Sequence, residues 1–203
     1  MRRPVARKAA KPLAKPTYFP PKNCLTRTLP PELAAQREFE EYHFRHFDFS
    51  QTQLPGRRFN DCLFESCNLA GVSLSRVSLQ NVAFVGCKLL GLEFNACPDL
   101  LFGVHFEQCQ LDYASFYGKK MPYTRFVDCS LQEANFTETD LTGVDFQRCQ
   151  LRRAVFHHAR LLGADFRTAQ EVALDPEVNE LKEARFALPS LPGLLTKYGL
   201  VID

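Results

Sequence analysis

The 203-residue sequence lacks the motifs by which enzymes are usually recognised. It contains no Gly-x-Gly, no phosphate-binding loop, no His-Glu-x-x-His and no Gly-x-Ser-x-Gly. It also lacks an apolar run close to the roughly 18 residues that a membrane span requires, and no secretory signal follows its basic start. These absences predict a non-enzymatic, cytoplasmic protein that has no cofactor, no small-molecule substrate and no membrane contact.

A Phe or Leu recurs at every fifth position along most of the chain, in two series, of which the second is interrupted only by Met121. The first series is Phe44, Phe49, Leu54, Phe59, Phe64, Leu69, Leu74, Leu79, Phe84, Leu89 and Phe94, and the second is Phe106, Leu111, Phe116, Met121, Phe126, Leu131, Phe136, Leu141, Phe146, Leu151, Phe156, Leu161 and Phe166. Two residues before most of these stands a small residue, usually Cys, Val, Ala or Thr. Each five-residue repeat therefore offers one large and one small side chain to a core.

A period of five fits neither the 3.6 residues of a helical turn nor the 2 of a strand, so the chain must turn once per repeat. Glycines two residues after large positions would make corners: Gly71, Gly86, Gly91, Gly103, Gly118, Gly143 and Gly163. Like residues also recur every 20 positions, as in Phe106, Phe126, Phe146 and Phe166. The sequence thus predicts a coil with four short sides per turn and stacked columns of identical side chains inside it.

Cysteine occurs eight times, but no two cysteines are spaced as Cys-x-x-Cys. Six fall on the small inward position: Cys62, Cys67, Cys87, Cys109, Cys129 and Cys149. We interpret these as packed thiols and not as metal ligands or disulfide partners. Cys97, in a break of the repeat, and Cys24, near the N-terminus, are expected to be more exposed.

The pattern of a small residue, Asp or Asn, Leu or Phe, any residue and Gly is that of the pentapeptide repeat, as in Thr139-Asp140-Leu141-Thr142-Gly143. Over roughly residues 40–187 the chain resembles pentapeptide repeat proteins. The resemblance implies an all-β fold, a right-handed quadrilateral β-helix. We expect a disordered basic, Pro-rich tail at 1–27, the β-helix at 28–187, and a short α-helical cap with a dimerisation role at 188–203.

The C-terminal stretch, from Ala184-Arg185-Phe186 through Leu194-Leu195 to Tyr198-Gly199-Leu200, looks most similar to the albicidin-resistance and microcin-immunity subfamily, and more distantly to the Qnr and MfpA quinolone-resistance proteins. Those relatives bind DNA gyrase or topoisomerase IV as dimeric rods and protect the enzyme from antibiotics or toxins. The resemblance implies a type II topoisomerase as partner, with a role in antibiotic resistance or self-immunity. A scaffold with an unrelated protein partner is the alternative.

Charge is distributed unevenly along the chain. Residues 1–27 hold eight Lys and Arg and no acidic residue, whereas the rest has 17 basic and 23 acidic residues. Such an arm is expected to stay unfolded, and it could contact DNA by neutralising phosphates. On the body, Asp145 and Asp165 would stack on one face near Glu107, as a DNA-mimicking protein would require, although basic residues interrupt the face. A solvated surface explains each of these acids individually.

Two breaks in the repeat are candidates for partner contact, because loops on rigid scaffolds often carry function. A local adjustment of the coil geometry explains both breaks at least as well. The first is a seven-residue step from Phe94 to Leu101, which contains Cys97, Pro98 and Asp99. The second puts Lys119 at a small inward position, and because burying an unpaired ammonium is costly, Tyr117 to Pro122 are expected to bulge outward. The candidate partner-binding residues are Cys97, Pro98, Asp99, Tyr117, Lys119, Lys120, Asp145 and Asp165.

After Phe166 the register fails at Glu171 and Pro176 and resumes at Leu181 and Phe186. The apolar residues that follow are spaced as on one face of a helix that ends at Gly199. This helix would cover the open end of the coil and, together with the residues after it, form a homodimer interface. The candidate interface residues are Leu188, Leu191, Leu194, Leu195, Tyr198, Leu200, Val201 and Ile202.

Overall fold

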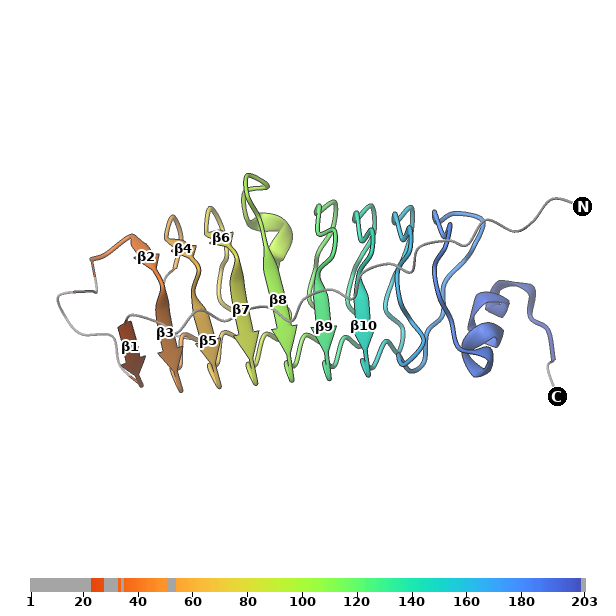
Figure 1. The fold of residues 1–203 in the computed structure, drawn as a ribbon, viewed down its shortest axis with the longest axis horizontal. Coiled ribbons are helices and arrows are strands. Elements are labelled where there is room, and N and C mark those ends of the chain that lie inside the picture. The colour runs from red at the N-terminus through yellow and green to blue at the C-terminus, as the bar shows by residue number, and fades with distance from the viewer. Residues whose placement is uncertain (1–22, 28–32, 34, 51–53, 202–203) are drawn as a thin grey trace, which may run out of the picture.

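The protein is a rod in which the chain coils around one long axis, as a computed structural model shows (Figure 1). The structure describes residues 23–27, 33, 35–50 and 54–201. Within these residues, no helix is long and apolar enough to cross a membrane. The predicted solenoid is confirmed: every strand pairs in parallel with a strand of the next turn.

Two parallel sheets line the rod. The first has seven strands in the order β1 (Asn23–Thr26), β3 (Tyr42–Arg45), β5 (Leu63–Glu65), β7 (Val82–Val85), β8 (Val104–Glu107), β9 (Arg125–Val127) and β10 (Asp145–Gln147). The second has three, β2 (Glu38–Glu40), β4 (Arg58–Asn60) and β6 (Ser78–Gln80). Single bridges between turns, such as Lys120 with Asp140, hold the other sides. Each side is short because a corner follows every few residues.

The core is a narrow column of stacked side chains, as the 20-residue period predicts. The rings of Phe116 and Phe136 stack with their centroids 5.1 Å apart, and Phe156 follows at 5.0 Å. A second column stacks in the same way, and the two columns meet edge to face, as where Phe126 meets Phe136. Phe136 is completely buried. Burying one Phe side chain stabilises the folded state by about 1.5–3 kcal/mol, because apolar surface is removed from water. These columns therefore supply most of the favourable free energy of folding.

The corners adopt the left-handed backbone conformation, as expected for Gly143, which has a φ of 65°. The ring of Tyr123 lies over this glycine, and a Cβ there would come within 2.6 Å of it. The corner predicted at Gly103 is wrong, since Leu101 has the positive φ of 60° instead. Leu101 is also 66% exposed and so does not take the large inward position.

Both ends of the rod differ from the prediction. The disordered tail predicted for residues 1–27 is wrong for Asn23–Thr26, which form β1 and pair in register with β3; residues 1–22 lie outside the described residues. At the other end, the predicted α-helix is replaced by two 3₁₀ helices, η3 (Leu188–Leu194) and η4 (Thr196–Tyr198). Pro192 explains the difference, because its ring would clash with the Leu188 carbonyl, four residues earlier, in an α-helix.

The six cysteines predicted to point inward are buried, and five of them form one column: Cys67, Cys87, Cys109, Cys129 and Cys149. Cys24 is exposed as predicted, but Cys97 is only 4% exposed, so the expectation for Cys97 is wrong. Burial raises the pKa of the Cys62 and Cys97 thiols to about 12. Within the described part of the chain, no group of three potential ligands could hold a metal ion.

Candidate partner-binding surfaces

The coil is interrupted once in its middle, between β7 and β8. A short 3₁₀ helix, η2 (Phe94–Ala96), leads to Cys97, after which Pro98 to Leu101 leave the wall of the tube. Leu100 is 79% exposed at the tip of this loop. Figure 1 shows the turn before β8 reaching further from the rod than its neighbours. The regular register returns at β8, where Phe84 pairs with Phe106.

Lys119 lies inside the tube and not on a bulge, so the predicted outward bulge of Tyr117 to Pro122 is wrong. The side chain is 2% exposed, and the backbone around it keeps the regular coil pattern, with the Lys119 N–H donating to the Phe116 carbonyl at 3.0 Å. The ammonium Nζ donates to the Asp99 carboxylate at 2.6 Å and to the Cys97 carbonyl at 2.5 Å. It also lies 4.6 Å from the centre of the Phe102 ring.

The two irregularities of the sequence are therefore one structural feature. Asp99 stands 20 residues before Lys119, one turn earlier, so the inserted loop places its carboxylate beside the ammonium of the next turn. Burying a charge is tolerable only where it is paired and hydrogen-bonded, and both conditions are met here. We call Pro98–Phe102, with the Lys119 that anchors it, the anchored loop. The pair fixes the base of a loop whose exposed residues include Leu100.

Tyr117 and Lys120, the other candidates in this region, do not join the anchored loop in one site. Tyr117 is 45% exposed, and a hydrogen bond with Glu138 raises the pKa of its hydroxyl group. Lys120 faces outward and bridges to Asp140 on the next turn. These two residues therefore belong to the wall of the rod, whereas Cys97, Asp99 and Lys119 are in direct contact.

Asp145 and Asp165 stack on the outward face of the seven-stranded sheet, as predicted. Asp145 also pairs in register with Arg125, and Asp165 bridges to Arg185, so a basic residue flanks the stack at each end. Burial and the charge of Asp165 raise the pKa of Asp145. Burial opposes ionisation of Asp165 as well, but hydrogen bonds from Arg167 hold its pKa below its ordinary value.

Charged residues on the wall pair with residues of opposite sign one turn away. Five such ion pairs join residues 20 positions apart: Arg45 with Glu65, Arg58 with Glu38, Arg148 with Asp128, Arg153 with Glu133, and Arg160 with Glu180. Each is exposed enough to contribute little to stability. Their effect on the surface is larger, because acidic and basic residues alternate along the rod.

The C-terminal segment covers the last turn of the coil only in part. Leu194 packs against the core, and Gly193 lies so close to the Val172 carbonyl that a Cβ would overlap it. The remaining apolar residues form what we call the C-terminal apolar patch: Leu188, Leu191, Leu195, Leu200 and Val201, with exposed fractions from 38% to 89%. Ile202, the last predicted interface residue, lies outside the described residues.

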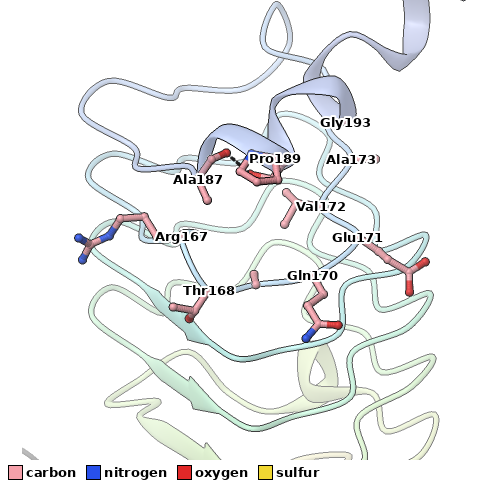
Figure 2. A pocket seen from close by; sticks show the side chains of 11 residues that line it. Arg167, Thr168, Gln170, Glu171, Val172, Ala173, Ala187, Pro189 and Gly193 are labelled. Atoms are coloured by element: carbon pink, nitrogen blue, oxygen red, sulfur yellow. Dashed lines mark hydrogen bonds between the residues drawn. The ribbon is translucent and has the colours of Figure 1, made fainter. Parts of the chain in front are cut away.

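Two features of this end were not predicted. Between η3 and the coil lies a pocket of about 540 Å³, lined by Val172, Ala187 and Pro189 among others (Figure 2). It sits where Glu171, with a φ of 52°, turns outward instead of continuing the Leu column. A separate cluster fixes η4: Lys197 Nζ pairs with Asp175 at 2.7 Å and Glu177 at 2.6 Å.

Tyr198, which was predicted to lie in a dimer interface, also joins this cluster. Its hydroxyl donates to Glu177 Oε1 at 2.7 Å, and its ring lies 5.0 Å from Lys197 Nζ. The hydrogen bond with Glu177 raises the pKa of Tyr198. Tyr198 therefore has a role within one chain, whether or not a second copy contacts it.

Comparison with known proteins supports the repeat architecture. A family model described as pentapeptide repeat region matches residues 57–121 and 100–173. Among solved structures, trypsin-treated QnrB1, a plasmid-mediated fluoroquinolone resistance protein, is 16% identical, with a TM-score of 0.59 over 82% of this chain and 90% of that one. HetL, a pentapeptide repeat protein involved in heterocyst differentiation regulation in the cyanobacterium Nostoc, is 17% identical over 73% of each chain, with a TM-score of 0.40. A search of curated proteins finds no match.

Proposed function

Because the chain belongs to the pentapeptide repeat family, we propose that it is a non-enzymatic protein that binds a type II topoisomerase, DNA gyrase or topoisomerase IV, and protects it from an antibiotic or toxin. The observation that carries the proposal is the likeness of the rod to QnrB1, a fluoroquinolone resistance protein. The proposal places the protein in the cytoplasm, where bacterial topoisomerases act on DNA.

We further propose that the anchored loop makes the specific contact with the enzyme. It interrupts the β-helix between β7 and β8, and it carries Leu100 and Leu101 with most of their surface exposed. Apolar side chains on a fixed base can bind without a large ordering cost, because the Lys119–Asp99 pair already holds the loop.

A homodimer joined through the C-terminal apolar patch is the second part of the proposal. Val201 is 89% exposed and Leu188 is 80% exposed, at the end of a solenoid that η3 covers incompletely. A second copy would bury these side chains, and a two-fold axis would bring the same patch of both chains together. Analytical ultracentrifugation of Leu188→Ser/Leu191→Ser against wild type tests this, with the expected outcome a monomer that has an unchanged circular dichroism spectrum.

DNA mimicry would be one way to bind the enzyme, through the acidic face that includes Asp145 and Asp165. The alternating ion pairs of the wall favour contact through the loop instead, because a mimic needs charge of one sign over a long surface. A salt titration separates the two modes. Binding through the loop should weaken little between 50 and 500 mM salt, whereas charge mimicry should weaken steeply.

The proposed function is tested by gyrase supercoiling with a fluoroquinolone, albicidin or microcin, while this protein is titrated. The expected result is restored supercoiling at intermediate concentration, or inhibition at high concentration. Leu100→Ser/Leu101→Ser should remove the effect, and Leu90→Ser, which changes another partly exposed leucine on the rod, is the matched control. If the wild-type protein affects neither gyrase nor topoisomerase IV, the proposal is wrong and the alternative, a scaffold with an unrelated protein partner, is favoured. Whether the basic residues 1–22 contact DNA stays a separate prediction.

A further inference from the structure

Five cysteines form a continuous column of thiols inside the tube. They are Cys67, Cys87, Cys109, Cys129 and Cys149, and none is more than 2% exposed. Each stands immediately before a residue that bridges to the neighbouring turn, as Lys88 does to Gln110. The anchored loop lengthens the interval between Cys87 and Cys109 to 22 residues, but the register keeps the two on neighbouring turns. The column is therefore unbroken over five turns of the coil.

The sulfur atoms of this column repeat at the spacing of the turns. Cys87 Sγ donates to the Phe64 carbonyl at 3.3 Å, and Cys109 Sγ donates to the Phe84 carbonyl at 3.3 Å. The two side chains therefore have the same orientation on consecutive turns. The rings of Phe64 and Phe84 stack with their centroids 5.1 Å apart. Since parallel turns keep one spacing throughout, neighbouring sulfur atoms are also about 5 Å apart.

Two sulfur atoms at this separation match a metal cation bound midway between them. A bond from zinc to a thiolate is about 2.3 Å long, so a linear sulfur–metal–sulfur unit with similar bonds spans about 4.6 Å. Soft cations prefer sulfur ligands, and the mercuric ion binds two thiolates in a linear geometry. Zinc takes four ligands, but the chain lacks Cys-x-x-Cys, and its described part has no group of three potential metal ligands. The column thus favours a two-coordinate soft cation over zinc.

The surroundings of the thiols favour a divalent cation over a monovalent one. When two thiols bind a divalent cation, two S–H bonds break, two sulfur–metal bonds form and two protons go to the solvent, so the buried unit stays neutral. A monovalent cation would leave one negative charge in an apolar core, which is costly. Burial raises the pKa of the Cys109 thiol, so its proton leaves only when a cation displaces it. The Cys67 N–H donates to Cys87 Sγ at 3.4 Å, and this bond strengthens as the sulfur becomes thiolate-like.

We propose that the cysteine column is a binding site for soft, two-coordinate divalent cations of the mercuric type, each held between the sulfur atoms of neighbouring turns. Five thiols in line hold two such cations and leave one thiol over. Each cation joins two turns that are otherwise held by hydrogen bonds and packing. Because the thiols are buried, a cation enters while a turn is locally open, and binding is slow. This inference does not depend on the identity of the partner enzyme.

Native mass spectrometry of the full-length chain tests the site. A Cys24→Ser protein, which lacks the exposed thiol, is incubated with mercuric chloride until binding is complete. A brief wash with 2-mercaptoethanol then removes cations that are held by one sulfur. We expect two retained cations per chain, each with the loss of two protons. Retention of no cation, or equal retention of zinc from zinc chloride, would overturn the proposal.

Two double variants in the same background lose equal numbers of thiols but differ in which thiols remain neighbours. Cys87→Ala/Cys129→Ala leaves three thiols that are two turns apart, and it should retain no cation. Cys67→Ala/Cys149→Ala leaves three consecutive thiols, and it should retain one. Both should fold, because buried alanines fill the equivalent position elsewhere in the tube, and circular dichroism checks this. Equal retention by the two variants would mean that adjacency in the column does not matter, which contradicts the proposal.

Discussion

Two neighbouring turns of the coil fill the same small inward position with different polar side chains. Thr139 occupies the small inward position of one turn, and its hydroxyl donates to the Phe116 carbonyl of the turn before at 2.9 Å. Lys119 occupies the equivalent position one turn earlier and reaches Cys97 and Asp99. The threonine needs only the regular coil, whereas the lysine needs a loop that supplies a carboxylate. The tube therefore accepts a buried hydroxyl without change, but a buried charge comes with an insertion.

The largest effect should come from the regular part of the tube. Phe136→Ala empties a ring position between Phe116 and Phe156, and we expect it to lower the free energy of unfolding by about 3–5 kcal/mol. Urea denaturation followed by circular dichroism measures the loss. A reduction below about 1 kcal/mol would contradict a tightly packed column.

The second-largest effect on stability should come from the anchored loop, and its size should depend on whether Asp99 and Lys119 can still pair. Asp99→Ala leaves the Lys119 ammonium buried beside a carbonyl and a ring, and should cost about 2–3 kcal/mol. The double variant Asp99→Ala/Lys119→Met removes the charge as well and should recover most of that loss, since paired apolar replacement is often neutral. If the double variant is as unstable as Asp99→Ala alone, the buried charge is not the cause.

Thr139→Val should have a smaller effect and completes the comparison. It removes one hydrogen bond, but the Phe116 carbonyl keeps the bond from the Lys119 N–H, so we expect a loss of about 1 kcal/mol or less. The same denaturation experiment measures it. A loss as large as that of Asp99→Ala would mean that the tube does not distinguish a hydroxyl from a charge.

The smallest effect concerns the C-terminal end and depends on pH. Hydrogen bonds from Lys197 lower the pKa of Asp175 and Glu177, so their contribution is full above the ordinary carboxyl pKa and is lost as the pH falls through the lowered values. We expect η4 to lose protection from hydrogen exchange below about pH 4, while β10 stays protected. Lys197→Met should make η4 weakly protected at all pH values; retained pH dependence in that variant would contradict the assignment.

Much of the tube could be predicted from spacing alone, because a core one side chain thick leaves each fifth residue little freedom. Phe136 and Cys129 lie where their register positions put them. The contact between Asp99 and Lys119 does not follow from either break taken alone, although their separation of 20 residues is the length of one turn. That spacing is a signal that sequence reasoning could have used.

The ends were predicted less well, for two physical reasons. The spacing of Leu188, Leu191 and Leu194 suits either type of helix, and only Pro192 inside the segment decides for a 3₁₀ helix. β1 consists of four residues beside a basic, Pro-rich segment, so composition hid a strand that exists because β3 offers it a free edge.

The inserted loop shows how a protein of this kind can change. Phe84 and Phe106 are ring neighbours although 22 residues separate them, two more than in a regular turn, and the stacking on either side continues undisturbed. An added segment at a corner shifts the numbering of everything after it but moves no side chain out of its column. A corner of the rod is thus a place where a loop can be added without disturbing the turns beyond it, and here Lys119, one turn later, holds the added loop through Asp99 and the Cys97 carbonyl.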